Sequence, residues 1–176
     1  TRDGALWYTG QMADVLGRVD PKTGKVKEYP VTTPHSGPHG LVEDREGNIW
    51  YTANTGALIG KLDPKTGAVV EYKMPDPQAK DPHTLIFDDS GILWFTVQNA
   101  NRIGRLDPKS GEIKLLTPPT PKSRPYGMAV NSKGTVYYVA FGTNKVVSID
   151  PKSLAMRLYA AFVDAIDGMF AIALWD

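Results

Sequence analysis

A histidine follows a proline at two places in the chain, and a tyrosine takes the same place at a third. The three stretches read SGPHGLVEDREGNIWYT from Ser36, KDPHTLIFDDSGILWFT from Lys80 and SRPYGMAVNSKGTVYYV from Ser123. Imidazole titrates near neutral pH, so His39 and His83 have the chemistry of a general base or a metal ligand. Because the stretches share one register, we expect His39, His83 and Tyr126 to point in a common direction.

A repeat of about 43 residues must position these side chains. One marker is an aromatic residue in GALWYT, GNIWYT, GILWFT and GTVYYV, at intervals of 43, 44 and 43 residues: Trp7, Trp50, Trp94 and Tyr137. A second marker, the aspartate of an Asp-Pro-Lys turn, keeps the same intervals at Asp20, Asp63, Asp107 and Asp150. Two independent motifs with one period predict a repeated structural unit.

Each period contains four short runs rich in β-branched and aromatic residues, separated by Gly, Asn, Asp and Pro turns. Four antiparallel strands per repeat is the pattern of a β-propeller blade. The sequence therefore predicts an all-β propeller with about four blades, at residues 1–30, 38–75, 82–117 and 125–159. The first and last blades are expected to be cut, which favours an arc from a six- or seven-bladed parent with exposed, self-associating edges.

Composition excludes several classes of protein. The net charge of +1 argues against nucleic acid or an anionic membrane as the main partner. The chain has no cysteine, so disulfides, thiol nucleophiles and thiolate metal sites are excluded. No apolar run is long enough to span a bilayer, while the cellular compartment stays open between cytoplasm and an exported location.

The repeat resembles that of the virginiamycin B lyase (streptogramin lyase) family. The resemblance covers about residues 3–159 and rests on Glu28-Tyr29-Pro30, Pro38-His39-Gly40, Trp50-Tyr51-Thr52 and Asn101-Arg102-Ile103-Gly104-Arg105. It implies a seven-bladed propeller and a carbon–oxygen lyase that opens a cyclic depsipeptide antibiotic at its ester, by elimination. It also implies a role in antibiotic resistance, a Mg²⁺ cofactor and a histidine base.

Carried over by motif, the resemblance implies His83 as the catalytic base and His39 as a metal ligand. The family has a glutamate two residues before the second histidine, and Asp81 occupies that place here. A further family glutamate is missing, because that region reads Val97-Gln98. Mg²⁺ usually needs carboxylate oxygens, so the loss predicts weak binding of the ion.

The remaining predicted site residues line the mouth of the central channel, where a small molecule or a peptide would bind: Tyr126, Gln98 and Arg124. Two other functions stay open. One is a propeller without catalytic activity that binds a protein or small ligand at this mouth. The other is a lactonase-like, metal-dependent hydrolase, for which no convincing glutamate begins an inner strand.

The last residues differ in composition from the repeats. From Ala160 to Asp176 there is no Lys, Arg or Pro, although Asp167-Gly168-Met169 aligns with Tyr126-Gly127-Met128. Three interpretations stay open: the degenerate start of a next blade, a short apolar helix, or a tail unrelated to the fold.

Overall fold

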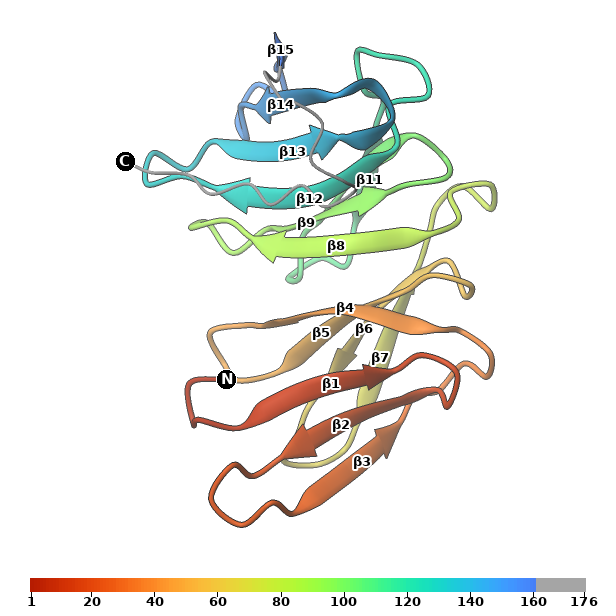
Figure 1. Cartoon of the computed structure of the whole chain (residues 1–176), viewed down its shortest axis with the longest axis vertical. Coiled ribbons are helices and arrows are strands. Elements are labelled where there is room, and N and C mark those ends of the chain that lie inside the picture. Colours follow the sequence, from red (N-terminus) through yellow and green to blue (C-terminus); the bar gives the residue numbers. More distant parts are fainter. Residues whose placement is uncertain (161–176) are drawn as a thin grey trace. The chain divides into compact units, whose positions relative to one another are not determined.

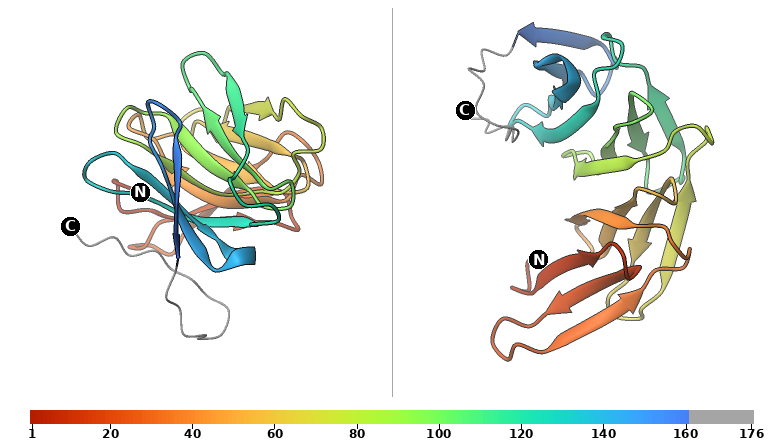
Figure 2. Two further views of the ribbon diagram at one scale, coloured as in Figure 1. Left: turned by 90° about the horizontal axis from the view of Figure 1, so that it is seen from above. Right: turned by 45° about the vertical axis from the view of Figure 1, so that its right-hand side comes forward.

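The computed structural model describes residues 1–160, which form four antiparallel β-sheets (Figures 1 and 2). The first sheet has three strands, β1 (Leu6–Gly10), β2 (Val15–Val19) and β3 (Val26–Pro30). The second has β4 (Pro38–Glu43), β5 (Ile49–Ala53), β6 (Leu58–Leu62) and β7 (Val69–Lys73). The third has β8 (Pro82–Phe87), β9 (Leu93–Val97), β10 (Arg102–Leu106) and β11 (Ile113–Leu116). The fourth has β12 (Pro125–Val130), β13 (Val136–Ala140), β14 (Lys145–Ile149) and β15 (Met156–Ala160).

Within each sheet the strands follow one another in chain order, which is the meander of a propeller blade. The chain divides into two compact units, Thr1–Leu85 and Ile86–Asp176, with the boundary inside β8. A short 3₁₀ turn, Phe141–Thr143, follows β13. Among residues 1–160, no helix is long and apolar enough to cross a membrane.

The sequence favours cut blades at both ends of the chain; the first sheet has three strands, whereas the last has four. Strand β15 pairs with β14 over five residues, although Leu154 replaces the glycine that closes this turn in the other repeats. Leu154 adopts a left-handed backbone with φ of 62°, and its amide donates to the Asp150 carbonyl at 2.8 Å. The Asp-Pro-Lys-Ser sequence therefore still closes the hairpin. The interpretations of residues 161–176 lie outside the described residues.

The predicted equivalence of the four aromatic markers is confirmed by the strand register. Trp7, Trp50, Trp94 and Tyr137 each pair with the corresponding residue of the next strand: Arg18, Lys61, Arg105 and Ser148. Trp50 and Trp94 are fully buried. Their indole N–H groups donate to the carboxylates of Asp44 and Asp88, both at 2.8 Å. The tryptophans are therefore structural side chains, as the repeat suggests.

Glycines of the Ile-Gly-Arg type allow aromatic rings to lie flat on the neighbouring strand. A Cβ on Gly17, Gly60 or Gly104 would lie 2.0 Å from a ring atom of the paired aromatic residue. Those partners are Tyr8, Tyr51 and Phe95. The rings cover the glycines, which explains why both positions recur in the first three repeats.

The core of the first unit lies between its first two sheets. Ile49, Tyr51 and Leu62 of the second sheet pack in one cluster with Leu16 and Tyr29 of the first. In the second unit the corresponding cluster contains Trp94, Ile103, Val136, Tyr138 and Ile149. One face of each sheet thus buries the apolar face of a neighbouring repeat.

The opposite face of the first sheet exposes apolar side chains. Leu6 is 61% exposed and Val26 56% exposed, in the repeat positions of Ile49 and Val69. Exposed apolar sheet faces favour association. We therefore expect the protein to self-associate with rising concentration, and the double variant Leu6→Lys, Val26→Lys to shift it toward the monomer in light scattering. A wild-type protein that stays monomeric at all concentrations would contradict this expectation.

Candidate functional site

The structure brings His39 and His83 together within the first unit. His39 lies in β4 and His83 in β8, each as the second residue of its strand after a proline. The two imidazole rings are 4.1 Å apart between centroids and tilted by 45°. His39 is exposed, whereas His83 is only 9% exposed. One ring is therefore open to solvent and the other lies largely beneath the surface.

A β-bulge shapes the start of β4. The pairing of β4 with β5 joins Pro38 to Ala53 and then shifts, so that Leu41 pairs with Tyr51. His39 and Gly40 fall inside this irregularity. Bulges re-aim side chains and occur often beside active sites. The bulge is therefore a local reason why the His39 side chain departs from the regular alternation of side chains along a strand.

Close approach of β4 and β8 depends on Gly40. A Cβ at this position would lie 2.5 Å from the His83 carbonyl oxygen and 2.8 Å from a methyl carbon of Leu85. Any side chain here would push the two histidine-bearing strands apart. The glycine of the Pro-His-Gly motif is therefore required by packing, and the same spacing sets the distance between the rings.

Burial and a neighbouring imidazole change the acid–base chemistry of His83. Removal from water, together with the positive charge that His39 can carry, lowers the pKa of His83 from 6.5 to about 4. At neutral pH the ring is therefore uncharged. Its Nδ1 lies 3.3 Å from the Thr84 hydroxyl oxygen, so this hydroxyl can fix the tautomer of the ring.

Asp81 precedes the buried histidine by two residues, in the turn that leads into β8. Its backbone is left-handed, with φ of 67°, immediately before Pro82. Residues before proline favour extended conformations, so this turn is strained. The Asp81 amide donates to the Asn54 carbonyl at 3.1 Å, which holds the turn against the loop after β5.

The other predicted site residues, Tyr126, Arg124 and Gln98, lie in the second unit. Tyr126 is 37% exposed, and its ring centroid is 5.9 Å from that of Phe141. The guanidinium of Arg124 lies 5.9 Å from the centroid of the same Phe141 ring. Gln98 is half-buried in the turn after β9.

Phe141 is the residue of this cluster that the sequence analysis missed. It occupies the turn position that Asn54 and Gln98 hold in the two preceding repeats. That change from amide to aromatic was the only sequence feature that distinguished it.

The described residues do not by themselves fit a magnesium site. Among residues 1–160, no group of three or more His, Asp or Glu side chains is arranged to hold a metal ion. The pair offers imidazole nitrogens, whereas Mg²⁺ prefers oxygen ligands in octahedral geometry. We therefore derive no chemical step through a metal.

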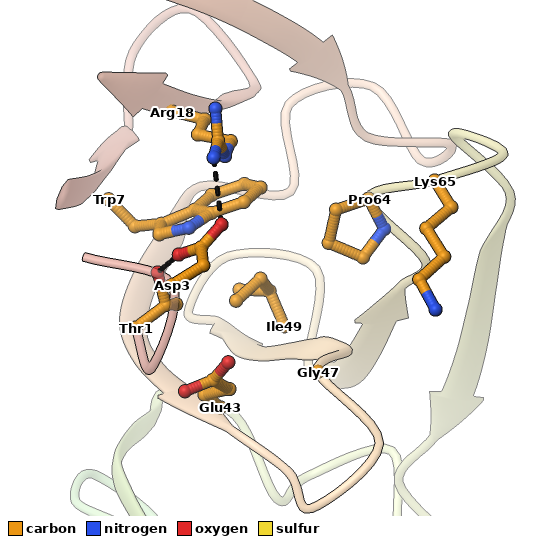
Figure 3. A pocket seen from close by; sticks show the side chains of 9 residues that line it. All are labelled: Thr1, Asp3, Trp7, Arg18, Glu43, Gly47, Ile49, Pro64 and Lys65. Carbon is orange, nitrogen blue, oxygen red and sulfur yellow. Dashed lines mark hydrogen bonds and ion pairs between the residues drawn. The ribbon is translucent and has the colours of Figure 1, made fainter. Parts of the chain in front are cut away.

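A hollow of about 210 Å³ lies elsewhere in the first unit (Figure 3). Trp7, Ile49 and Pro64 give it an apolar lining, and neither histidine reaches it. Its two acidic residues are paired, Asp3 with Arg18 at 2.7 Å and Glu43 with Arg2 at 3.5 Å. Because neither histidine lines this hollow, the candidate site is the histidine pair.

Comparison with known proteins identifies the repeat. A family model described as the virginiamycin B lyase family matches residues 1–157. The chain belongs to the virginiamycin B lyase family. A search among curated proteins found no significant match.

Solved lyases of this family have the same fold. The chain is 31% identical to virginiamycin B lyase from Staphylococcus aureus, with a TM-score of 0.84, over 92% of this chain and 54% of that lyase. A catalytically inactive variant of the Staphylococcus aureus lyase with quinupristin gives 32% identity, a TM-score of 0.84, and coverage of 92% and 53%. A streptogramin B lyase is 30% identical to the chain, with a TM-score of 0.84, over 92% of this chain and 52% of that lyase. The chain thus spans about half the length of these lyases.

The low pKa of His83 makes the stability of this family member depend on pH. The folded protein binds a proton at His83 only near pH 4, whereas the unfolded chain binds it near 6.5. The free energy of unfolding should therefore fall as the pH drops from 6.5 to 4, by at most about 3 kcal/mol. Urea denaturation at several pH values measures this loss.

The control for this prediction is the third histidine. His35 has a side chain that is 97% exposed, so His35→Asn should leave the pH dependence intact. His83→Asn should remove this component of it. Equal pH dependence in the wild type and in His83→Asn would show that His83 is not the group responsible.

Proposed function

We propose that the chain forms part of a streptogramin lyase, a carbon–oxygen lyase that opens a cyclic depsipeptide at its ester, with His83 as the base. The observation that carries the proposal is the contact of His39 and His83 on β4 and β8, the first strands of their sheets, with ring centroids 4.1 Å apart. The family match over residues 1–157 supports the type of reaction. The chain covers about half of each solved lyase, so the activity is proposed for the protein as a whole.

The reaction requires a base that is uncharged at neutral pH. In an elimination, the base takes a proton from the carbon next to a carbonyl, and a double bond forms between this carbon and its neighbour. The bond from that neighbour to the ester oxygen breaks, and a carboxylate leaves. No water is consumed. His83 is neutral at pH 7 because its pKa is about 4, so the ring is in the form that can accept a proton.

The low pKa also makes His83 a weak base. The exposed His39 lies beside it and can stabilise the protonated His83 ring. When His83 takes up a proton, the His39 ring beside it can accept a hydrogen bond or stack against the imidazolium. Substrate that covers the pair would exclude water from both rings. We propose that His39 acts in this supporting role.

The experiment is incubation of the protein with quinupristin, followed by mass spectrometry. Elimination gives a ring-opened product of unchanged mass, resolved by chromatography, whereas a lactonase-like hydrolysis adds one water. Parallel reactions with added Mg²⁺ and with a chelator test the predicted cofactor. Product with added water, or no product under any of these conditions, would overturn the lyase assignment.

One observation favours binding without catalysis as a second candidate. Tyr126, Phe141 and Arg124 form a partly exposed aromatic and cationic surface in the second unit. Such surfaces bind planar or aromatic groups of ligands. Unchanged quinupristin that nevertheless binds in calorimetry, with affinity lost in Arg124→Ala, would support this candidate instead.

A further inference from the structure

The threonine of the Trp-Tyr-Thr motif has no role in the chemistry proposed above, although it follows the aromatic marker in three of the four repeats. In the second sheet this residue is Thr52, on β5, and it is completely buried. Its hydroxyl accepts a hydrogen bond from the Gly40 amide at 2.8 Å and donates one to the His83 carbonyl at 2.8 Å. One oxygen atom therefore joins the two strands that carry the histidines.

The bulge explains why this hydroxyl is needed. Regular pairing between β4 and β5 is interrupted between Pro38 and Leu41, opposite Thr52. The Gly40 amide therefore has no partner in the ladder and would be left without a hydrogen bond in a half-buried position. A buried amide without a hydrogen-bond partner destabilises the folded state. Thr52 supplies the missing acceptor and uses its own proton to hold β8.

We propose that Thr52 is a positioning residue that sets the spacing of His39 and His83. The two bonds fix the amide directly after His39 and the carbonyl of His83 itself, so they act on the backbone of both residues of the pair. The catalytic meaning of this spacing rests on the proposed function, but the spacing itself can be measured without any substrate.

The repeat offers a matched comparison. Thr9 holds the same place in the first sheet, and its hydroxyl donates to the His39 carbonyl at 3.0 Å. It lies in a more exposed setting than the completely buried Thr52. A change at Thr9 thus alters one histidine backbone, whereas a change at Thr52 alters the link between the two.

The test compares the two imidazole rings by NMR in the wild type and in three variants. Thr52→Val keeps the shape of the side chain but removes the hydroxyl, so the strands that carry the histidines should separate. We expect the cross-relaxation between the His39 and His83 rings to weaken and the Gly40 amide to exchange its hydrogen faster. Thr52→Ser, which keeps the hydroxyl, should restore both readouts, and Thr9→Val should leave the exchange of the Gly40 amide unchanged.

Outcomes separate this proposal from the proposed function. If Thr52→Val does not fold, Thr52→Ser and the protection of the Gly40 amide from hydrogen exchange in the wild type decide. A Thr52→Val protein with unchanged ring contact and unchanged Gly40 exchange, a Thr52→Ser protein that has lost the ring contact, or a rapidly exchanging Gly40 amide in the wild type would overturn the role of Thr52. If the protein turns over quinupristin, kcat should fall about 10²-fold in Thr52→Val with little change in KM. Changed NMR readouts in Thr52→Val without any turnover of quinupristin would support the positioning role of Thr52 and contradict the proposed lyase activity.

Discussion

Replacing His83 with asparagine is expected to slow the ring opening of quinupristin about 10²- to 10⁴-fold, which is the usual contribution of a general base. The buried imidazole is uncharged at pH 7 and lies on the inner strand β8 against His39. Asparagine is close in size but cannot accept a proton under these conditions. The initial rate of product formation, followed by chromatography and mass spectrometry, measures the effect.

His35→Asn is the matched control for this substitution. His35 precedes the first Pro-His-Gly motif and has a side chain that is 97% exposed, with Asp14 at 4.0 Å as its only described ion-pair partner. Its replacement should leave the rate unchanged. Equal rates for His83→Asn and the wild type would remove the base from the proposed mechanism.

Replacing Gly40 with alanine is expected to destabilise the protein by about 1–3 kcal/mol, the usual cost of forcing an extra methyl group into a packed site. The new Cβ would lie 2.5 Å from the carbonyl oxygen of His83, and a backbone atom cannot move aside as a flexible side chain would. The strands β4 and β8 must separate, so the contact between the two imidazoles should also be lost. Urea denaturation and ring-to-ring cross-relaxation in NMR measure the two effects.

Substitution of a second glycine serves as the control, because it distinguishes the steric clash at Gly40 from the strain of the backbone alone. Gly24 lies in an open turn with φ of 68°, where an added Cβ would meet nothing within 4 Å. Gly24→Ala should therefore cost only the strain of the left-handed backbone, about 1 kcal/mol, and leave the histidines in contact. If Gly40→Ala retained both full stability and the ring contact, β4 and β8 would not be as close as the structure has them.

The blade architecture could be predicted from the sequence because it depends on local, repeated features. Aromatic markers, Asp-Pro-Lys turns and alternating strands recur with one period, and the pairing of Trp50 with Lys61 and of Trp94 with Arg105 follows from that period. The fourth strand of the last sheet was harder to predict, because the turn glycine is replaced by Leu154, which adopts the left-handed conformation nevertheless.

The candidate site could be predicted only in part. The shared slot indicated that His39 and His83 would lie on neighbouring inner strands, and they do lie in contact. Their unequal exposure could not be predicted, since the two motifs differ by a single residue, Gly40 against Thr84. The hydroxyl bridge of Thr52 was hidden as well, because it depends on a bulge and on two strands far apart in the chain.

We propose that His83 removes a carbon-bound proton in an elimination. The most direct test uses quinupristin that carries deuterium at the carbon that loses this proton, which is bonded to the carbon that carries the ester oxygen. The wild type should form a ring-opened product that has lost the deuterium and gained no water, and His83→Asn should form it at a greatly reduced rate. A product that keeps the deuterium and contains an added water, or labelled quinupristin left intact by the wild type, would contradict it.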